Sequence, residues 1–206
     1  RIMSKTNFIL LAALRTACAS KAATALVEPL QPQSSVIELR NVTIPAHFTR
    51  SDFDWERQTL TLQPFSMDLY SSEAIRRMKP GDRFLFDSDT LTVETVEFDG
   101  DYVLVNKGIE EGGADLRQEE NGCYRGVIWD DYATFTPLDA VTLPLSDTWT
   151  LTDCGENPTD PSIEVTAEHQ TYLDALPDYN EQFSPLNTLV EIQNGQIVSI
   201  ARRWIP

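Results

Sequence analysis

Polar and apolar residues alternate along several short stretches of this chain, which is the pattern of β-strands buried on one face. The alternation is clear over residues 59–62 (Thr-Leu-Thr-Leu) and over 148–152, where Trp149 and Leu151 are separated by threonines. Further strands are predicted over 36–42, 83–86, 91–98, 102–105, 124–129, 134–136, 141–143, 188–193 and 196–204. Most of the chain is therefore predicted to be β-structure.

Turn residues separate these strands, and few helices are expected. Asp99-Gly100 and Asn194-Gly195 each stand between two apolar stretches, and both dipeptides favour the tight turns of β-hairpins. Helical periodicity is confined to a short segment over 72–78 and an amphipathic one over 166–176. The pattern predicts a mainly β fold, a small antiparallel β-barrel or sandwich with a short helix and a C-terminal helix plus β-hairpin.

One short segment adds to this expectation. Residues 78–84 read Met-Lys-Pro-Gly-Asp-Arg-Phe, and the proline and glycine predict a turn before the strand over 83–86. The segment resembles the Pro-Gly-Asp turn and following apolar strand of small SH3-like β-barrels. The resemblance covers seven residues and implies a barrel of that general kind.

The first 25 residues have the layout of a leader for export. Basic residues precede the seven-residue apolar run 8–14, and small residues surround Cys18. Because a bilayer-spanning helix needs about 20 apolar residues, the run predicts a cleaved signal rather than an anchor. Thr16, Ala17 and Cys18 resemble the lipid-attachment site of bacterial lipoproteins, although Arg15 stands where that motif has leucine. Ordinary signal cleavage after Ala19 or Ala25 is the alternative, and a buried N-terminal helix is a third reading.

The rest of the chain is expected to be a tether and one domain. Residues 26–35 are rich in proline, glutamine and serine, which is typical of a linker. Residues 36–206 then form a single mainly β domain, in which 162–206 is a candidate subdomain. Cys123 and Cys154 are expected to form a disulfide, because exported proteins meet oxidising conditions. Two separate buried thiols are the alternative.

Charge narrows the class of partner. The chain has 16 lysines and arginines against 32 aspartates and glutamates, a net charge of −16. Such a surface repels phosphate backbones, so nucleic acid is not expected as a partner. Contact with a membrane is expected only through a lipid anchor. A protein is the first expected partner and a carbohydrate the second.

Two clusters combine aromatic and acidic residues, as sugar-binding sites do. The first contains Asp52, Asp54 and Trp55, in a segment between predicted strands, and Trp55 is expected to be exposed. The second contains Trp129, Asp131 and Tyr132. The alternative for Trp129, as for Trp149, is a place in the core of its strand.

The sequence contains no comparable motif for catalysis. The sequence contains no nucleophile elbow, P-loop, dinucleotide fingerprint or zinc-protease motif, and its cysteines lack zinc spacing. Asp87-Ser88-Asp89 begins like a calcium loop but lacks the later ligands, so no cofactor is expected, with calcium as an alternative. The leading interpretation is a non-enzymatic binding module of a bacterial cell envelope. The alternatives are a carboxylate-dependent, glycosidase-like hydrolase, a carbohydrate-binding domain and an envelope assembly factor.

Overall fold

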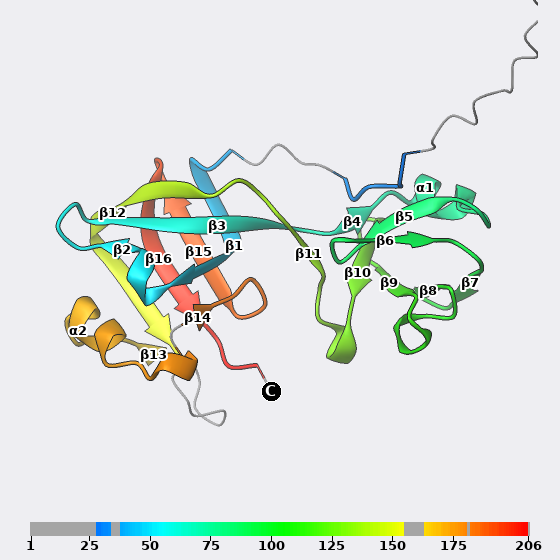
Figure 1. Cartoon of the computed structure of the whole chain (residues 1–206). Coiled ribbons are helices and arrows are strands. Elements are labelled where there is room, and N and C mark those ends of the chain that lie inside the picture. The colour runs from blue at the N-terminus through cyan, green and yellow to red at the C-terminus, as the bar shows by residue number, and fades with distance from the viewer. Residues whose placement is uncertain (1–27, 34–37, 155–162, 181, 206) are drawn as a thin grey trace, which may run out of the picture.

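The structure is a computed structural model that describes residues 28–33, 38–154, 163–180 and 182–205. Two lobes lie side by side in Figure 1, and each has its own hydrophobic core. The second lobe is formed by the segment between residues 69 and 134, together with residues 28–33. It is therefore inserted between two strands of the first lobe. The predicted leader, including Cys18, lies outside the described residues.

The first lobe is a closed β-barrel. Its strands are β1 (Asn41–Thr49), β3 (Thr59–Met67), β12 (Val141–Asp153), β15 (Thr188–Gln193) and β16 (Gln196–Arg202). They follow the order β3-β1-β15-β16-β12, and a further pairing of β12 with β3 closes the ring. A five-stranded Greek-key barrel is also the architecture of OB-folds, which carry unrelated functions, so the architecture alone assigns none.

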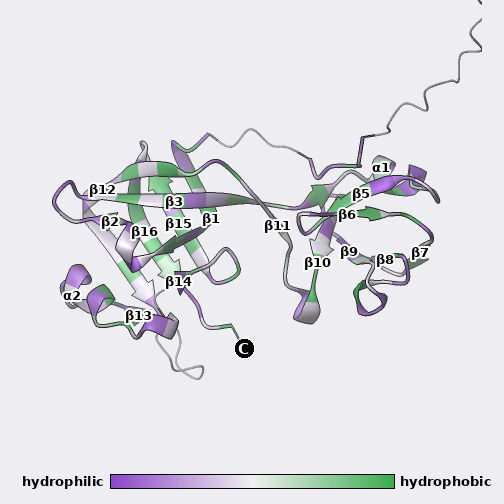
Figure 2. Cartoon of the chain, viewed as in Figure 1, coloured by the Kyte–Doolittle hydropathy of each residue, from purple (hydrophilic) through white to green (hydrophobic). Residues whose placement is uncertain are grey.

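Alternation along the strands explains this barrel. Leu60 and Leu62 are buried in the core, whereas Thr61 between them is exposed. Figure 2 shows the same mixture of apolar and polar positions along the barrel strands. The predicted turn at Asn194-Gly195 joins β15 to β16, with φ of 51° and 79° at its two residues. Both angles are left-handed, as a tight hairpin of this class requires.

Short elements complete the first lobe. They are β2 (Phe53–Asp54), β11 (Phe135–Pro137), β13 (Ile163–Glu164), β14 (Gln182–Phe183), α2 (His169–Asp174) and the 3-10 turns η1 (Arg50–Asp52) and η4 (Asp178–Asn180). Helix α2 begins three residues later than predicted, because Glu168 caps it by accepting the backbone N–H groups of Gln170 and Thr171. The helix, β15 and β16 belong to the same core as β1 and β3.

The second lobe is a small β-sandwich. Its larger sheet has the order β4 (Leu69–Tyr70), β10 (Tyr124–Val127), β9 (Ala114–Gln118), β8 (Tyr102–Val105) and β7 (Val96–Asp99). The smaller sheet contains β5 (Arg83–Phe86) and β6 (Asp89–Thr92). The predicted helix is α1 (Ser72–Arg77), capped by Ser71, and η2 (Ile109–Glu111) and η3 (Trp129–Asp131) are 3-10 turns. The predicted turn over 79–82 leads into β5.

The second lobe is held to the preceding segment of the chain and, at its junction with the barrel, by a buried carboxylate. Leu30, in the predicted tether, lies along β5: its N–H donates to Arg83 and its carbonyl accepts from Leu85. Asp68 is buried where β3 passes into the second lobe, and its carboxylate accepts the hydroxyls of Thr134 and Thr136. Described residues of the tether are therefore part of the second lobe.

The mainly β, antiparallel prediction is confirmed; among the described residues the parallel pairings are that of β12 with β16 and the single bridge between Leu30 and Phe84. The predicted Cys123–Cys154 disulfide is wrong. Cys123 precedes β10 in the second lobe, whereas Cys154 follows β12 in the barrel, so the two thiols are not at bonding distance. Sequence separation alone places no constraint on which lobe a cysteine joins.

Candidate functional site

A cleft opens on the outer face of the larger sheet of the second lobe. The buried side chains of Val103 and Val105 face the core, so Leu104 between them lies on the opposite, outer face. Strand register places Leu104 beside Asp115, and Asp115 beside Val127. These three residues line a cavity of about 470 Å³, which is in the size range of small-ligand sites.

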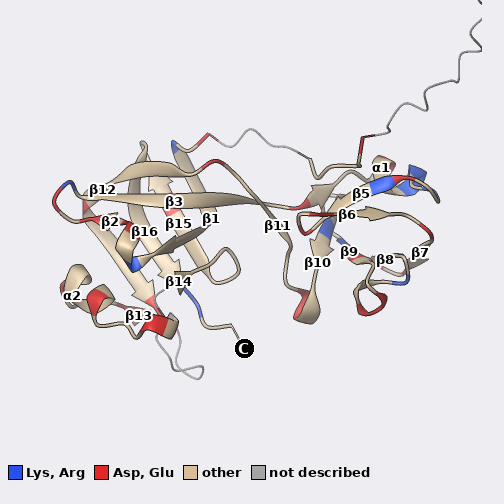
Figure 3. Cartoon of the chain, in the orientation of Figure 1, with Lys and Arg blue, Asp and Glu red and all other residues tan. Residues whose placement is uncertain are grey.

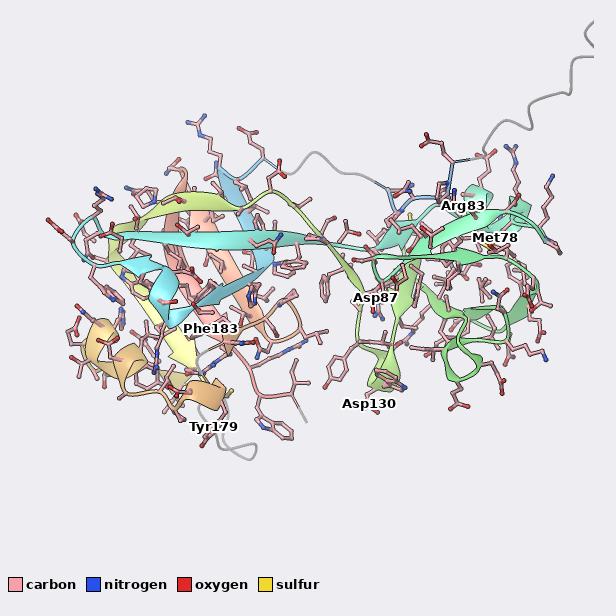
Figure 4. All side chains as sticks on the ribbon, in the orientation of Figure 1. Met78, Arg83, Asp87, Asp130, Tyr179 and Phe183 are labelled. Atoms are coloured by element: carbon pink, nitrogen blue, oxygen red, sulfur yellow. The ribbon has the colours of Figure 1, made fainter. Side chains whose placement is uncertain are left out.

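Two loops form the walls of this cleft. One follows β8 and supplies Lys107, Gly108 and Glu110, and the other follows β10 and supplies Trp129 through Asp131. In Figure 4, Asp130 lies at the tip of the loop that follows β10. Both walls therefore come from loops of one sheet, after the strands on either side of β9, and loops held on a sheet commonly carry binding sites.

The walls are built from strained backbone. Residues 106, 107, 130 and 131 have φ of 53°, 67°, 55° and 63°, although none of them is glycine. They make up four of the eight non-glycine residues with positive φ in the described part of the chain. Left-handed backbone costs free energy in such residues and persists only where neighbours enforce it, often at ligand sites. Half of the described non-glycine residues with left-handed backbone thus lie at or beside this one cleft.

Side-chain hydrogen bonds hold the first wall. The amide of Asn106 accepts the Glu94 N–H at 2.6 Å and donates to the carbonyl of Thr92 at 2.8 Å. Asp115 accepts the N–H of Ile109 at 3.1 Å, which fastens the loop to the floor of the cleft. The loop after β8 is therefore a wall fixed by hydrogen bonds at both of its ends.

Ion pairs hold the second wall. Arg117 and Arg125 lie side by side on the outer face of β9 and β10, and both pair with Oδ2 of Asp131. Arg125 also donates to the Asp131 carbonyl at 2.9 Å and to Glu119 at 2.6 Å. The other oxygen of Asp131 is buried without a hydrogen-bond partner in the described structure, one of three such side-chain atoms there.

Aromatic rings frame the cleft. Trp129 is 71% exposed, although indole is among the largest apolar groups, so the second wall presents a flat ring to solvent. Tyr102 also lines the cleft and is 37% exposed, with the Arg117 guanidinium 5.9 Å from its ring centre. A fixed, exposed ring next to charged hydrogen-bonding groups can bind a ligand that has both an apolar face and polar edges.

The structure places the predicted site residues in different surroundings. Trp129 and Asp131 both line the cleft, and Tyr132 follows them but does not line it. The expectation that Trp149 belongs to the core is confirmed, since only 8% of it is exposed, whereas Trp129 does not fill a core. Arg117, Arg125 and Tyr102 were not predicted, because only the strand register brings them beside residue 131.

The other predicted cluster lies in the first lobe and has a local structural role. Asp52 accepts the N–H of Thr49 at 2.6 Å, and Asp54 accepts the N–H of Arg57 at 2.9 Å. The ring of Trp55 is half-buried and stacks on Phe53 with centroids 4.7 Å apart. These carboxylates shape the turn between β1 and β3, and Trp55 packs against the barrel core.

A second hollow is apolar. It has a volume of about 380 Å³ and is lined by Met67, Phe135, Leu186 and Leu189, among others. Met67 is 37% and Leu189 48% exposed, so this groove also presents apolar surface to solvent. Its lining also includes Asn187, Thr188, Arg202 and Arg203, but most of the surface that it offers is apolar.

The described residues contain no group of three or more histidine, cysteine, aspartate or glutamate side chains placed to hold a metal ion. Among these residues, no helix has the length and apolar character needed to cross a membrane. Comparison of the chain with family models, with curated proteins and with solved structures finds no match.

Proposed function

We propose that this chain is an exported, non-enzymatic binding module and that the cleft of its second lobe binds a carbohydrate. The observation that carries the proposal is Trp129, a 71% exposed indole on a loop fixed by two arginines. A sugar ring has one face of C–H groups, which packs on an aromatic ring, and a rim of hydroxyls. Asp130 and Lys107 lie on the two walls, where their side chains can form hydrogen bonds with such hydroxyls.

Two of the four carboxylates that line the cleft are engaged in the structure and are not free to act in hydrolysis. A glycosidase uses two carboxyl groups, one as acid and one as base or nucleophile, on either side of the bond that breaks. Asp131 is instead held by two guanidinium groups, and Asp115 by a backbone N–H. Asp131 holds the second wall and Asp115 fastens the first wall to the floor of the cleft, so we assign both carboxylates a positioning role.

Glycan binding can be measured directly. Purified chain lacking residues 1–25 is applied to an array of bacterial and plant glycans, and hits are quantified by calorimetry. Trp129→Ala is expected to lose most binding, because a stacking ring of this kind contributes about 1–3 kcal/mol. Trp204→Ala is the matched control, since Trp204 is also exposed but lies at the C-terminal end of the barrel lobe. Equal loss in both variants, or no glycan bound, would refute the proposal.

Export is part of the proposal and rests on the leader alone. We infer that residues 1–25 direct export and that Cys18 receives lipid if Arg15 is tolerated at the attachment site. The intact mass of the product from a bacterial host distinguishes the outcomes. A product that begins at Cys18 with added acyl chains is a tethered lipoprotein, and one that begins at Ser20 or Leu26 is freely secreted. An uncleaved product contradicts export.

A protein partner is the second candidate, favoured by the apolar groove. Leu189 and Met67 expose apolar surface there next to Phe135. Quantitative cross-linking on intact cells tests it with Leu189→Glu, which places a charge in the groove. A specific cross-linked protein recovered with the wild type and lost with this variant supports the candidate, and an unchanged pattern contradicts it.

A further inference from the structure

We propose that the ligand of the cleft is a cationic amino sugar, such as a hexosamine with a free amine. This inference rests on the proposed function and adds the charge of the ligand to it. The charges that line the cleft, their distribution over both walls and the adjacent aromatic rings favour an amino sugar over neutral and anionic sugars.

The charges of the cleft are unbalanced. Its lining contains the carboxylates of Glu110, Asp115, Asp130 and Asp131 but only one cationic side chain, Lys107. Arg117 and Arg125 lie behind Asp131, and Arg125 also pairs with Glu119. With these neighbours included, five carboxylates face three cations, so two negative charges are left over. A cationic ligand group would neutralise part of this excess.

The excess charge lies on opposite walls. Glu110 belongs to the wall after β8 and Asp130 to the wall after β10, and neither makes an ion pair among the described residues. Figure 3 shows acidic residues on both of these loops. An ammonium group between the walls would be attracted from two sides, whereas a group on an open surface would meet one carboxylate.

The aromatic rings act in the same direction. A cation near the face of tryptophan or tyrosine is attracted by the ring, and the C–H face of a sugar packs on the same surface. Trp129 and Tyr102 are both exposed at this cleft. A ligand with an apolar ring face and one ammonium group therefore matches more features of the cleft than a neutral sugar does.

Anionic sugars are disfavoured by the same charges. A uronic acid or phosphorylated sugar would add a negative charge to a cleft with two in excess, on a chain with a net charge of −16. Its carboxylate would have to compete with Asp131 for Arg117 and Arg125, which already hold that residue. Repulsion between like charges in the cleft would lower the affinity for an anionic sugar.

The test compares four oligosaccharides of equal length by calorimetry at about pH 6, where the amine is protonated. These are oligomers of glucosamine, N-acetylglucosamine, glucose and glucuronic acid. Exposed ion pairs contribute up to about 1 kcal/mol each, or about fivefold. Two such pairs predict that the glucosamine oligomer binds about 5- to 25-fold more tightly than its N-acetylated form. The preference should shrink as salt is raised.

Variants assign the preference to the two walls. Glu110→Gln with Asp130→Asn removes both charges, and asparagine tolerates the left-handed backbone at residue 130. This double variant is expected to lose the preference while it still binds the N-acetylated oligomer. Glu56→Gln with Asp147→Asn is the matched control, because both acids are exposed on the barrel lobe, away from the cleft. Circular dichroism confirms that both double variants are folded.

The outcomes separate the inference from the proposed function. Equal affinity for the charged and neutral oligomers, or preference for glucuronic acid, overturns the inference and leaves carbohydrate binding intact. A preference that survives in the Glu110/Asp130 double variant, or is lost equally in the control, also overturns it. Failure to bind any of the four, with no hit on the glycan array, overturns both.

Discussion

The barrel contains a buried ion pair whose removal should be severely destabilising. Arg202 on β16 is 2% exposed, and its guanidinium donates to both oxygens of Asp153 on β12, at 2.8 and 2.7 Å. The hydroxyl of Tyr172 on α2 donates to the same carboxylate at 2.7 Å, and burial raises the pKa of that hydroxyl. The group thus joins the helix to two parallel strands.

The cost of Arg202→Met follows from this geometry. Methionine keeps most of the apolar contact that the arginine stem makes, while the carboxylate of Asp153 loses its buried cation. Breaking a buried pair from one side costs about 3–5 kcal/mol, because an uncompensated charge remains. Replacing both partners, as in Asp153→Leu with Arg202→Met, leaves no buried charge and is expected to recover most of that loss.

Urea unfolding, followed by tryptophan fluorescence and by circular dichroism, gives the free energy of unfolding of each variant. Arg203→Met is the control. Arg203 is the next residue along the chain and its side chain is exposed, so this substitution should change the free energy of unfolding by less than about 0.5 kcal/mol. A loss of less than about 1 kcal/mol in Arg202→Met, or a double variant as unstable as the single one, would refute this account of the pair.

Three further substitutions or reactions have defined outcomes. Partial desolvation, and then the carboxylates of Asp68 and Asp89, raise the pKa of Asp87, although much of its side chain is exposed. Its ionisation therefore lowers the stability of the folded state as the pH rises above the ordinary pKa of an aspartate. Asp87→Asn should therefore raise the Tm at about pH 7 and leave it unchanged at about pH 3. Thermal melts at the two pH values measure this, and an unchanged Tm at about pH 7 would contradict it. Gly113→Ala would place a methyl group 2.0 Å from the carbonyl of Val105, so the melting temperature should fall, and an unchanged Tm contradicts the contact. Burial raises the pKa of the Cys154 thiol, so mass spectrometry should find Cys123 alkylated first by iodoacetamide in the native protein, and the reverse order refutes this.

Much of the fold could be predicted because local chemistry and tertiary structure agree. The Asn194-Gly195 and Asp99-Gly100 turns both form hairpins, and the alternation over 59–62 gives a strand with one buried face. In these segments the turn residues and the apolar pattern specify the same structure. Helix α2 is shorter than its periodicity suggests, because Glu168 caps it late.

The arrangement of the strands could not be predicted from the same signals. The division into two cores depends on which strands pair, and β3 is separated from its partner β12 by the whole second lobe. The wrong disulfide has the same cause. Cys123 and Cys154 are 31 positions apart in sequence, but one belongs to the inserted lobe and the other to the barrel. Long-range pairing has no signature within a short window.

The site shows most clearly what a local pattern can and cannot provide. Trp129 and Asp131 were found because an aromatic residue beside acids is visible in a few consecutive letters. The same signal at Trp55 marks a packed turn, so composition could not tell an exposed ring from a buried one. The difference lies in Arg117 and Arg125, which reach residue 131 only because β9 pairs with β10. These ion pairs hold the strained loop in a form that keeps Trp129 in solvent, so the site depends on strand register as much as on its own residues.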